Sequence, residues 1–236
     1  AMSLLGAIGD SDVKRLVFSS TCATYGEPAT MPIVESTPQH PINPYGQAKL
    51  AVERMISDLV ASRPDLAAMK LRYFNVAGCD AAGGLGEDHT PETHLVPILL
   101  QAALGQRDGV AIYGTDYPTP DGTCIRDYVH VSDLIEAHLL ALNALSPGDD
   151  VALNLGIGRG FSVREVVEAA QRVTGVPFAV REAARRPGDP PSLYADASKA
   201  RERLGWRPRY LDIEAVIATA WAWMRAHPNG YGEGNA

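Results

Sequence analysis

Tyr45 and Lys49 are the residues whose types and spacing most directly suggest chemistry. They lie four apart in the segment 43–60, NPYGQAKLAVERMISDLV, so a helix would place the phenol and the ammonium side by side on one face. A nearby cation favours the phenolate and lowers the pKa of a tyrosine, which makes Tyr45 a candidate general base near neutral pH. The alternative is a lysine whose stem packs on the protein while its charge reaches water.

The segment that carries this pair has the pattern of an amphipathic helix. Asn43 is a good N-cap residue, and Pro44 suits the first helical position. Apolar residues recur with helical spacing at Ala48, Ala51, Val52, Met55, Ile56, Leu59 and Val60, opposite Gln47, Arg54, Ser57 and Asp58. Lys49 projects between the directions of Ile56 and Val60, so we expect it to point inward.

Two predicted strands flank this helix and place further polar residues near it. The run KRLVFSS (14–20) is typical of a buried strand, and a loop over residues 20–43 with four prolines follows it. After the helix, AAMKLRYFNVAG (67–78) is predicted to be a second strand. Strand, helix and strand in this order indicate a parallel α/β unit, whose active sites lie at the carboxyl ends of the strands. Ser19 to Thr21 and Phe74 to Asn75 occupy those ends.

The rest of the chain is predicted to be mixed α/β, with a division between two lobes near residue 78. Helices are expected at 95–104, 132–145, 162–175, 198–204 and 213–226. Strands are expected at 109–114, 151–156 and 178–182.

The composition excludes several classes of protein. The chain has 236 residues, of which 46% are hydrophobic, and a net charge of −7. This charge argues against nucleic acid or an anionic membrane as a partner, because both attract basic patches. No apolar run is long enough to cross a membrane and no signal peptide is recognisable, so we expect a cytoplasmic protein. Three widely spaced cysteines indicate reduced thiols and no zinc knuckle.

Two motifs invite a functional reading that the residues do not support. GIGRGFS (156–162) has G-x-G-x-G spacing instead of G-x-G-x-x-G, and a tight turn explains it better than a dinucleotide loop. GEDHTPETH (86–94) gathers Glu87, Asp88, His89, Glu92 and His94. Because Pro91 prevents them from sharing one helical face, we expect a polar loop and no metal, with a metal site as the minority alternative. His130 and His138 are expected to be structural.

Charged residues in the second half could bind phosphate. Arg126 follows a glycine-containing loop, and Arg186 precedes Gly188 and Asp189. Arginine can hold phosphate oxygens with two parallel hydrogen bonds, although most arginines lie on solvated surfaces.

Taken together, the motifs resemble the extended short-chain dehydrogenase/reductase family, and within it the epimerases that act at C4 of UDP-hexoses. The motifs are FSSTCATYGEP, NPYGQAKLAVE, LRYFNVAG, GEDHTPETHLVP, YGTDYPTPDGTCIRDYVHVSDL, NLGIGRGFSV, RRPGDPPSLYADASKA and LGW. The resemblance implies that residues 1–78 are part of a Rossmann-like NAD-binding domain with a parallel sheet. Residues 79–236 would form a smaller UDP-sugar-binding lobe, with residues 125–145 returning to the first domain. It also implies a homodimer.

The resemblance assigns roles to individual residues. Tyr45 is the base, Lys49 is its pKa partner and a ligand of the nicotinamide ribose, and Thr21 hydrogen-bonds the reacting sugar oxygen. Ser19 and Phe74 border the nicotinamide. The residues expected to bind the UDP-sugar are Asn75, Leu95, Ala111, Tyr113, Arg126, Arg186 and Asp189, together with His94, where the family often has Asn, and Leu193, which lines the hexose pocket.

The implied reaction interconverts UDP-glucose and UDP-galactose. Tyr45 takes the 4-hydroxyl proton while NAD takes hydride from C4, and hydride then returns to the other face of the 4-keto sugar. Sugar-nucleotide dehydratases place an acidic pair where this chain has Cys22 and Ala23, so dehydration is disfavoured.

The family also opens with a segment that carries the glycine-rich NAD loop, for which this sequence has no counterpart. We therefore expect a fragment whose N-terminal strands are absent. The alternatives are a catalytically silent UDP-sugar-binding module and a sibling reductase or decarboxylase.

Overall fold

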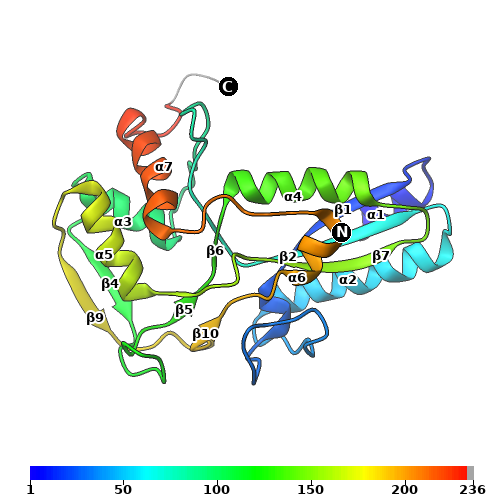
Figure 1. Ribbon diagram of the computed structural model, residues 1–236, viewed down its shortest axis with the longest axis horizontal. Helices are drawn as coiled ribbons and strands as arrows, with labels where there is room; N and C mark the ends of the chain where they lie inside the picture. The colour runs from blue at the N-terminus through cyan, green and yellow to red at the C-terminus, as the bar shows by residue number, and fades with distance from the viewer. Residues whose placement is uncertain (233–236) are drawn as a thin grey trace. The chain divides into compact units, whose positions relative to one another are not determined.

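The structure is a computed structural model that describes residues 1–232. The chain folds into two compact units (Figure 1). Unit 1 contains Ala1–Phe74, Leu134–Arg159 and Leu193–Arg207. Unit 2 contains Asn75–Asp133, Gly160–Ser192 and the chain from Pro208 on.

A three-stranded parallel sheet forms the centre of unit 1. Its order is β1 (Arg15–Thr21), β2 (Ala67–Tyr73) and β7 (Asp150–Leu155). The middle strand β2 is buried along nearly its whole length, as expected for a parallel strand covered on both faces. Thr21 is paired with Tyr73, so the carboxyl ends of β1 and β2 are level with each other.

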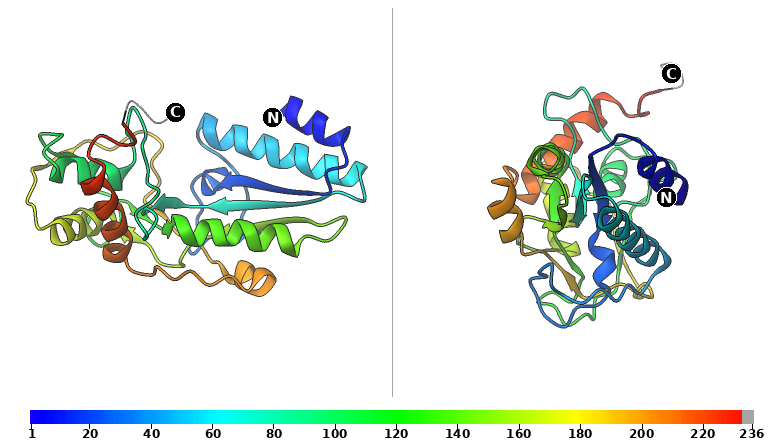
Figure 2. Two further views of the ribbon diagram at one scale, coloured as in Figure 1. Left: turned by 90° about the horizontal axis from the view of Figure 1, so that it is seen from above. Right: turned by 90° about the vertical axis from the view of Figure 1, so that its right-hand side faces the viewer.

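Helices cover both faces of this sheet. Figure 2 shows α2 (Pro44–Ser62) on one face and α4 (Val131–Ala144) and α6 (Ser198–Leu204) on the other. The N-terminal helix α1 (Met2–Gly9) packs on α2 through a cluster that includes Ile8. Asn43 caps α2, because its side chain accepts a hydrogen bond from the Gly46 N–H at 2.8 Å. The predicted start of this helix is therefore confirmed.

The buried face of α2 differs from the predicted one. Its buried residues are Gly46, Leu50, Glu53, Ile56 and Val60, whereas the structure leaves Ala48 and Ala51 exposed. The prediction followed apolar residues, but the face that contacts the sheet includes a carboxylate. Glu53 can occupy this position because it has partners there, and Lys49 beside this face is partly buried.

Unit 2 is built from short strands and three helices. Its helices are α3 (Leu95–Ala103), α5 (Val163–Thr174) and α7 (Ile213–Ala226), which pack on one another. Two parallel pairs join β3 (Asn75–Ala77) to β6 (Tyr128–His130) and β4 (Val110–Tyr113) to β9 (Val180–Ala183). A third set has the order β10 (Ser192–Leu193), β5 (Ile125–Arg126) and β8 (Phe161–Ser162).

The prediction of an α/β fold with a parallel sheet is confirmed. One predicted strand is wrong in detail, because the run 67–78 is divided at Phe74 between β2 and β3. The backbone changes partner here, since the Asn75 N–H donates to the Asp127 carbonyl at 3.0 Å.

The units change at residue 74 and not at 78, and the chain returns to unit 1 at Leu134 and again at Leu193. That one unit binds NAD and the other a UDP-sugar stays a prediction. Among residues 1–232, no helix has both the length and the apolar character needed to cross a membrane.

Candidate active site

The N-terminus of α2 brings Tyr45 to the end of strand β1. A short 3-10 helix, η1 (Cys22–Tyr25), follows β1, and the backbone of Gly46 lies against it. A Cβ atom at Gly46 would lie 2.4 Å from the Ala23 carbonyl oxygen, so only glycine permits this approach. Tyr45, the neighbouring residue, is 54% exposed and hydrogen-bonds Thr21.

The Thr21 hydroxyl has a defined hydrogen-bonding direction. Its Oγ1 accepts from the Ala23 N–H at 3.2 Å. A hydroxyl has one proton to donate, so that proton is free to point toward another oxygen, such as that of Tyr45. Thr21 is only 7% exposed, which limits competition from water for this bond.

Lys49 connects the helix to β1 on the same side of the site. Its Nζ donates to the Ser19 carbonyl at 2.7 Å and lies 5.7 Å from the centroid of the Tyr45 ring. The Ser19 hydroxyl in turn lies 3.0 Å from His138 Nε2. Because His138 Nδ1 faces the Leu134 carbonyl at 2.8 Å, Nδ1 carries the proton and Nε2 accepts from Ser19. Three predicted site residues, Ser19, Tyr45 and Lys49, are thus brought together with Thr21.

The direction of the Tyr45 pKa differs from the expected one. Burial of the phenol raises its pKa, and nearby Tyr73 and Cys22 add to this, while the hydrogen bond with Thr21 lowers it. The net pKa lies above the ordinary value. The expectation that Lys49 brings it below that value is wrong for this structure, because desolvation of the phenolate outweighs the favourable contacts.

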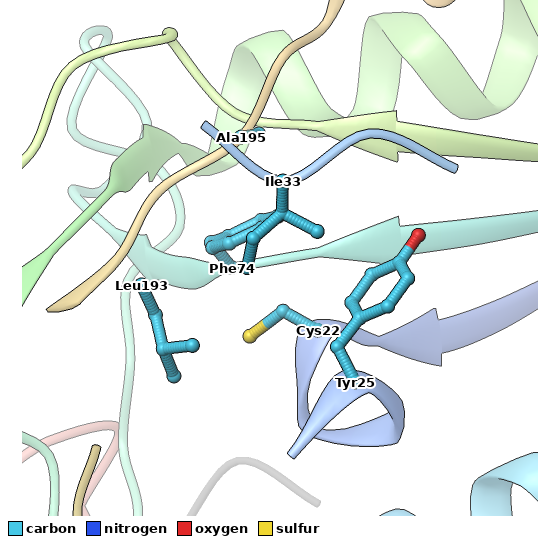
Figure 3. Close-up of a cluster of buried hydrophobic side chains, with 6 residues drawn as sticks. All are labelled: Cys22, Tyr25, Ile33, Phe74, Leu193 and Ala195. Carbon is cyan, nitrogen blue, oxygen red and sulfur yellow. The ribbon is translucent and has the colours of Figure 1, made fainter. Parts of the chain in front are cut away.

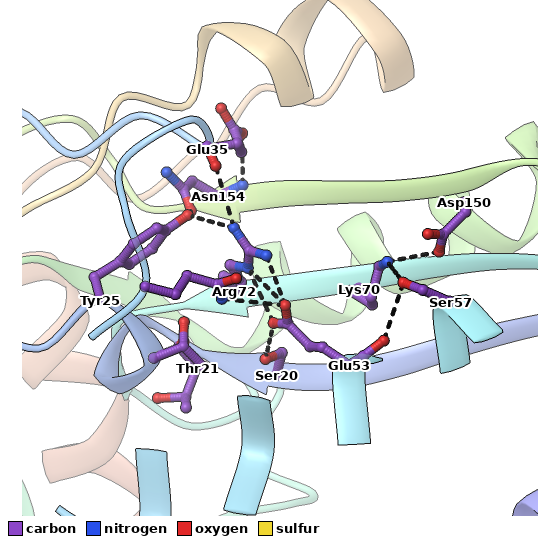
Figure 4. Close-up of polar contacts among 12 residues, drawn as sticks. Ser20, Thr21, Tyr25, Glu35, Glu53, Ser57, Lys70, Arg72, Asp150 and Asn154 are labelled. Carbon is purple, nitrogen blue, oxygen red and sulfur yellow. Dashed lines mark hydrogen bonds and ion pairs between the residues drawn. The ribbon is translucent and has the colours of Figure 1, made fainter. Parts of the chain in front are cut away.

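A buried ion pair close to Thr21 was not predicted from the sequence (Figure 4). Glu53 on α2 accepts from Arg72 Nη2 on β2 at 2.6 Å and from Arg72 Nε at 2.9 Å. Ser20 on β1 also donates to Glu53. Burial tends to raise the pKa of Glu53, but the bonds from Arg72 and Ser20 outweigh burial and the net pKa is lowered. The sequence feature that could have indicated this ion pair is the placement of Glu53 on the same face of α2 as Leu50 and Ile56.

The same network continues to η1 and β7. Arg72 Nη1 donates to the Tyr25 hydroxyl at 2.9 Å, and Tyr25 donates to Asn154 Oδ1 at 2.7 Å. The Asn154 N–H donates to Glu35 at 2.7 Å. Burial raises the pKa of Tyr25 to about 12. The network therefore links α2, all three strands of the sheet and η1, and it fixes the elements that carry Thr21 and Tyr45.

Phe74 and Leu193 lie together in unit 1. Figure 3 shows them in one buried cluster with Cys22, Tyr25, Ile33 and Ala195. Phe74 is 6% exposed and Leu193 is 8% exposed. The positions predicted to border the nicotinamide and the hexose thus share an apolar cluster that begins one residue after Thr21.

Two pairs of predicted UDP ligands are in contact in unit 2. Arg126 Nη2 lies 3.4 Å from Asp189 Oδ1, and the Arg126 side chain is 12% exposed. The guanidinium of Arg186 lies over the ring of Tyr113, 3.8 Å from its centroid. Such stacking leaves the edges of the guanidinium available for further hydrogen bonds.

The other predicted ligands of unit 2 lie on separate elements. Asn75 is exposed at the start of β3, and Leu95 is the first residue of α3. Ala111 is partly buried on β4, two residues before Tyr113. His94 is the exposed N-cap residue of α3.

The predicted residues therefore form two groups. Unit 1 carries Ser19, Thr21, Tyr45, Lys49, Phe74 and Leu193, while unit 2 carries Asn75, His94, Leu95, Ala111, Tyr113, Arg126, Arg186 and Asp189. The first group can exchange a proton through hydroxyl groups, and the second offers guanidinium groups that suit phosphate oxygens.

The chain is similar to known epimerases along nearly its whole length. It is 52% identical over 234 residues to a UDP-glucose 4-epimerase of Halalkalibacterium halodurans, a match that covers 99% of this chain and 70% of the relative. It is 39% identical to the structure of UDP-glucose 4-epimerase from Bifidobacterium longum in complex with NAD⁺ and UDP. That match has a TM-score of 0.92 and covers 98% of this chain and 69% of that one.

A second solved structure extends the range of ligands seen among similar proteins. The UDP-glucose-4-epimerase from Stenotrophomonas maltophila, with bound NAD and formylated UDP-arabinopyranose, is 41% identical with a TM-score of 0.92 and covers 96% of this chain and 68% of that one. Residues 1–156 also match the model of the NAD dependent epimerase/dehydratase family. The resemblance noted in the sequence is confirmed, and the chain belongs to the NAD dependent epimerase/dehydratase family.

Proposed function

We propose that the chain catalyses the NAD-dependent interconversion of UDP-glucose and UDP-galactose, with Tyr45 as the proton-transfer group. The observation that carries this proposal is the contact of Tyr45 with Thr21, beside the Lys49 ammonium, at the carboxyl end of β1. A similar reaction at C4 is stated in the names of the relatives. The proposed activity is that of an isomerase.

The residues of unit 1 fit the nicotinamide side of NAD, the cofactor of this family. Lys49 offers an ammonium for ribose hydroxyls, close to the Ser19 backbone carbonyl and the Tyr45 ring. Phe74 contributes an apolar surface. When bound, NAD would supply the acceptor and donor of the C4 hydride, and the positive charge of its oxidised form would favour the phenolate of Tyr45.

Tyr45 and Thr21 then handle the proton of the sugar. Tyr45 accepts the proton of the 4-hydroxyl group and later returns it to the same oxygen. Thr21 keeps its Oγ1 bonded to the Ala23 N–H and directs its own proton to the reacting oxygen. The burial of Thr21 favours this bond over one to water.

The nucleotide half of the substrate is assigned to unit 2. Arg126 and Arg186 hold the diphosphate with charge-assisted hydrogen bonds, and Asp189 orients Arg126. Ala111 and Tyr113 border the uracil, and Asn75 and Leu95 complete the contacts. Tight binding of the nucleotide and few fixed contacts to the hexose suit a reaction in which the keto sugar must turn over.

The chain carries no acidic pair next to Thr21 that would support dehydration. The two following positions are Cys22 and Ala23, and Cys22 lies in the apolar cluster with Phe74. Elimination of water requires groups that can give and take protons at a second carbon. Epimerisation transfers only the proton of the 4-hydroxyl group, so it fits these residues better than dehydration does.

Replacing Tyr45 by Phe tests the proposal. The wild-type chain, supplied with NAD, is expected to equilibrate UDP-glucose and UDP-galactose, and Tyr45→Phe should lower the rate by about 10²–10⁴-fold, because the phenol is the proton-transfer group. Anomeric NMR signals of the two nucleotides give the rate. Tyr194→Phe is the matched control. Equal rates in Tyr45→Phe and wild type, or UDP binding by a wild-type chain that never equilibrates the sugars, would contradict the proposal.

A further inference from the structure

We propose that the loop before α3 holds a site for a divalent transition-metal cation, with Zn²⁺ as its best match. His89, Glu92 and His94 are the three ligands, and Glu87 is the fourth. One ligand atom from each of the first three lies within 4.8 Å of the others. Nitrogen and carboxylate oxygen together are ligands that Zn²⁺ prefers.

Three of the distances among these ligand atoms are close to those of a tetrahedral zinc site. Metal–ligand bonds of about 2.0–2.1 Å place neighbouring ligand atoms about 3.3 Å apart. Glu92 Oε1 lies 2.9 Å from His94 Nδ1 and 3.9 Å from His89 Nδ1, and Glu87 Oε1 lies 2.9 Å from His94 Nδ1. Shifts of less than an ångström would make these distances equal. The two histidine side chains are half exposed, so a cation can reach them.

The charges around His94 also point to a cation. Two carboxylates, Glu87 and Glu92, converge on one nitrogen, His94 Nδ1, which has a single proton at most to share between them. A divalent cation bound between them would bring opposite charge to both carboxylates.

The loop is anchored on both sides of the cluster. A Cβ atom at Gly86 would lie 1.9 Å from the Trp223 ring, so the backbone rests directly on the indole. The Tyr231 N–H donates to Asp88 at 2.9 Å. After the cluster, Arg107 donates to the Glu92 carbonyl at 3.4 Å, and α3 begins at Leu95. Such anchoring holds the ligands close together before the ion binds.

Sequence spacing disfavoured this site for a reason that does not apply to a folded loop. Pro91 does prevent the five polar residues from sharing a helical face, and the segment is a loop as expected. A loop can nevertheless fold back, and here it places His89 beside His94 with ring centroids 5.4 Å apart.

Metal binding to the whole chain tests the inference without measuring catalysis. After dialysis against a chelator and then buffer, ZnCl₂ is titrated calorimetrically, and CoCl₂ is added separately to record the visible spectrum. We expect one equivalent of Zn²⁺ to bind, a tetrahedral Co²⁺ spectrum, and no comparable binding of Mg²⁺, which prefers oxygen ligands.

Variants assign the site. His89→Ala and His94→Gln should each weaken Zn²⁺ binding at least tenfold, and Glu87→Gln should weaken it less. His40→Gln changes an exposed histidine elsewhere and should bind as the wild type does. Circular dichroism checks that each variant is folded. Absence of saturable Zn²⁺ uptake by the wild type would show that the cluster is an ion-pair network only, and unchanged uptake in both histidine variants would place the ion elsewhere. Either result overturns the inference, whatever the outcome for Tyr45→Phe.

Discussion

At the scale of single residues, the pKa of Tyr45 is set by opposing contacts. Burial raises it, whereas the hydrogen bond from Thr21 lowers it by stabilising the phenolate. Thr21 can act in this way because the Ala23 N–H fixes its hydroxyl oxygen. Its one proton can lie between the phenolate and the reacting sugar oxygen, so the threonine is expected to tune the base as well as to contact the substrate.

Replacing Thr21 by Val removes that hydrogen bond and should raise the pKa of Tyr45 further. Because the phenolate is the base, the rise of kcat with pH should move to higher pH, and kcat at neutral pH should fall by about tenfold or more. Thr21→Ser keeps the hydroxyl and should retain a profile close to that of the wild type. The pH dependence of kcat for the three proteins measures this. A lower kcat with an unshifted profile in Thr21→Val would rule out the tuning role.

At the scale of elements, α2 is held to the sheet by a buried charge pair as well as by apolar contacts. Glu53 and Arg72 are 3% and 5% exposed. Removing one member of a buried pair leaves the other charge without a partner, which costs more than the pair contributes when intact. The register of α2 on β1 and β2, and with it the position of Tyr45, depends on this pair.

Glu53→Gln should therefore lower the free energy of unfolding by about 3–5 kcal/mol. The lowered pKa of Glu53 means that its carboxylate stabilises the folded chain above the unfolded value of 4.5, and that this contribution is lost as the pH falls through the lower folded pKa. The difference in the free energy of unfolding between Glu53→Gln and the wild type should thus become smaller as the pH falls. Urea unfolding at several pH values measures it. Asp58→Asn alters an exposed carboxylate of the same helix and should change stability by less than about 0.5 kcal/mol.

Local signals in the sequence predict the bounds of helices and strands better than they predict which elements pack or pair with one another. The predicted bounds of α6 and α7 agree with the structure, because caps and periodicity are local properties; Gly205, for example, ends α6 in the left-handed conformation. The Glu53–Arg72 pair joins residues 19 apart in sequence, and helical periodicity carries no information about β2. The division at Phe74 was missed for the same kind of reason, because β3 pairs with a strand more than fifty residues away in the chain.

At the scale of the whole molecule, the proposed roles are divided between the two units. The proton-transfer residues lie in unit 1, and the arginines assigned to the diphosphate lie in unit 2. Their identities could be proposed from motifs in the sequence. The stacking of Arg186 on Tyr113 and the pairing of Arg126 with Asp189 required the fold, since each joins residues more than sixty apart.

Because the proposed roles are divided in this way, substitutions in unit 2 should affect UDP binding, and substitutions in unit 1 should affect the rate of turnover. Arg186→Ala should weaken UDP binding by about 10–100-fold, because a charge-assisted hydrogen bond contributes about 1.5–3 kcal/mol. Tyr45→Phe should leave the dissociation constant of UDP within about twofold of the wild type while it lowers the rate of turnover by about 10²–10⁴-fold. Calorimetric titration with UDP, paired with the NMR rate, separates the two. Arg181→Ala, an exposed arginine on β9, is the control for lost positive charge. Equal losses of UDP affinity in Arg186→Ala and Arg181→Ala would argue against a specific diphosphate contact.

The chain passes several times between its two units, and this limits how such a protein can change during evolution. Neither unit is one continuous stretch, because the chain crosses between them after Phe74, Asp133, Arg159, Ser192 and Arg207. A single recombination crossover at any point before Arg207 would therefore exchange parts of both units at once and would bring together core residues from two different parent proteins. Variation in this chain is expected to accumulate by point substitution and not by shuffling of intact modules.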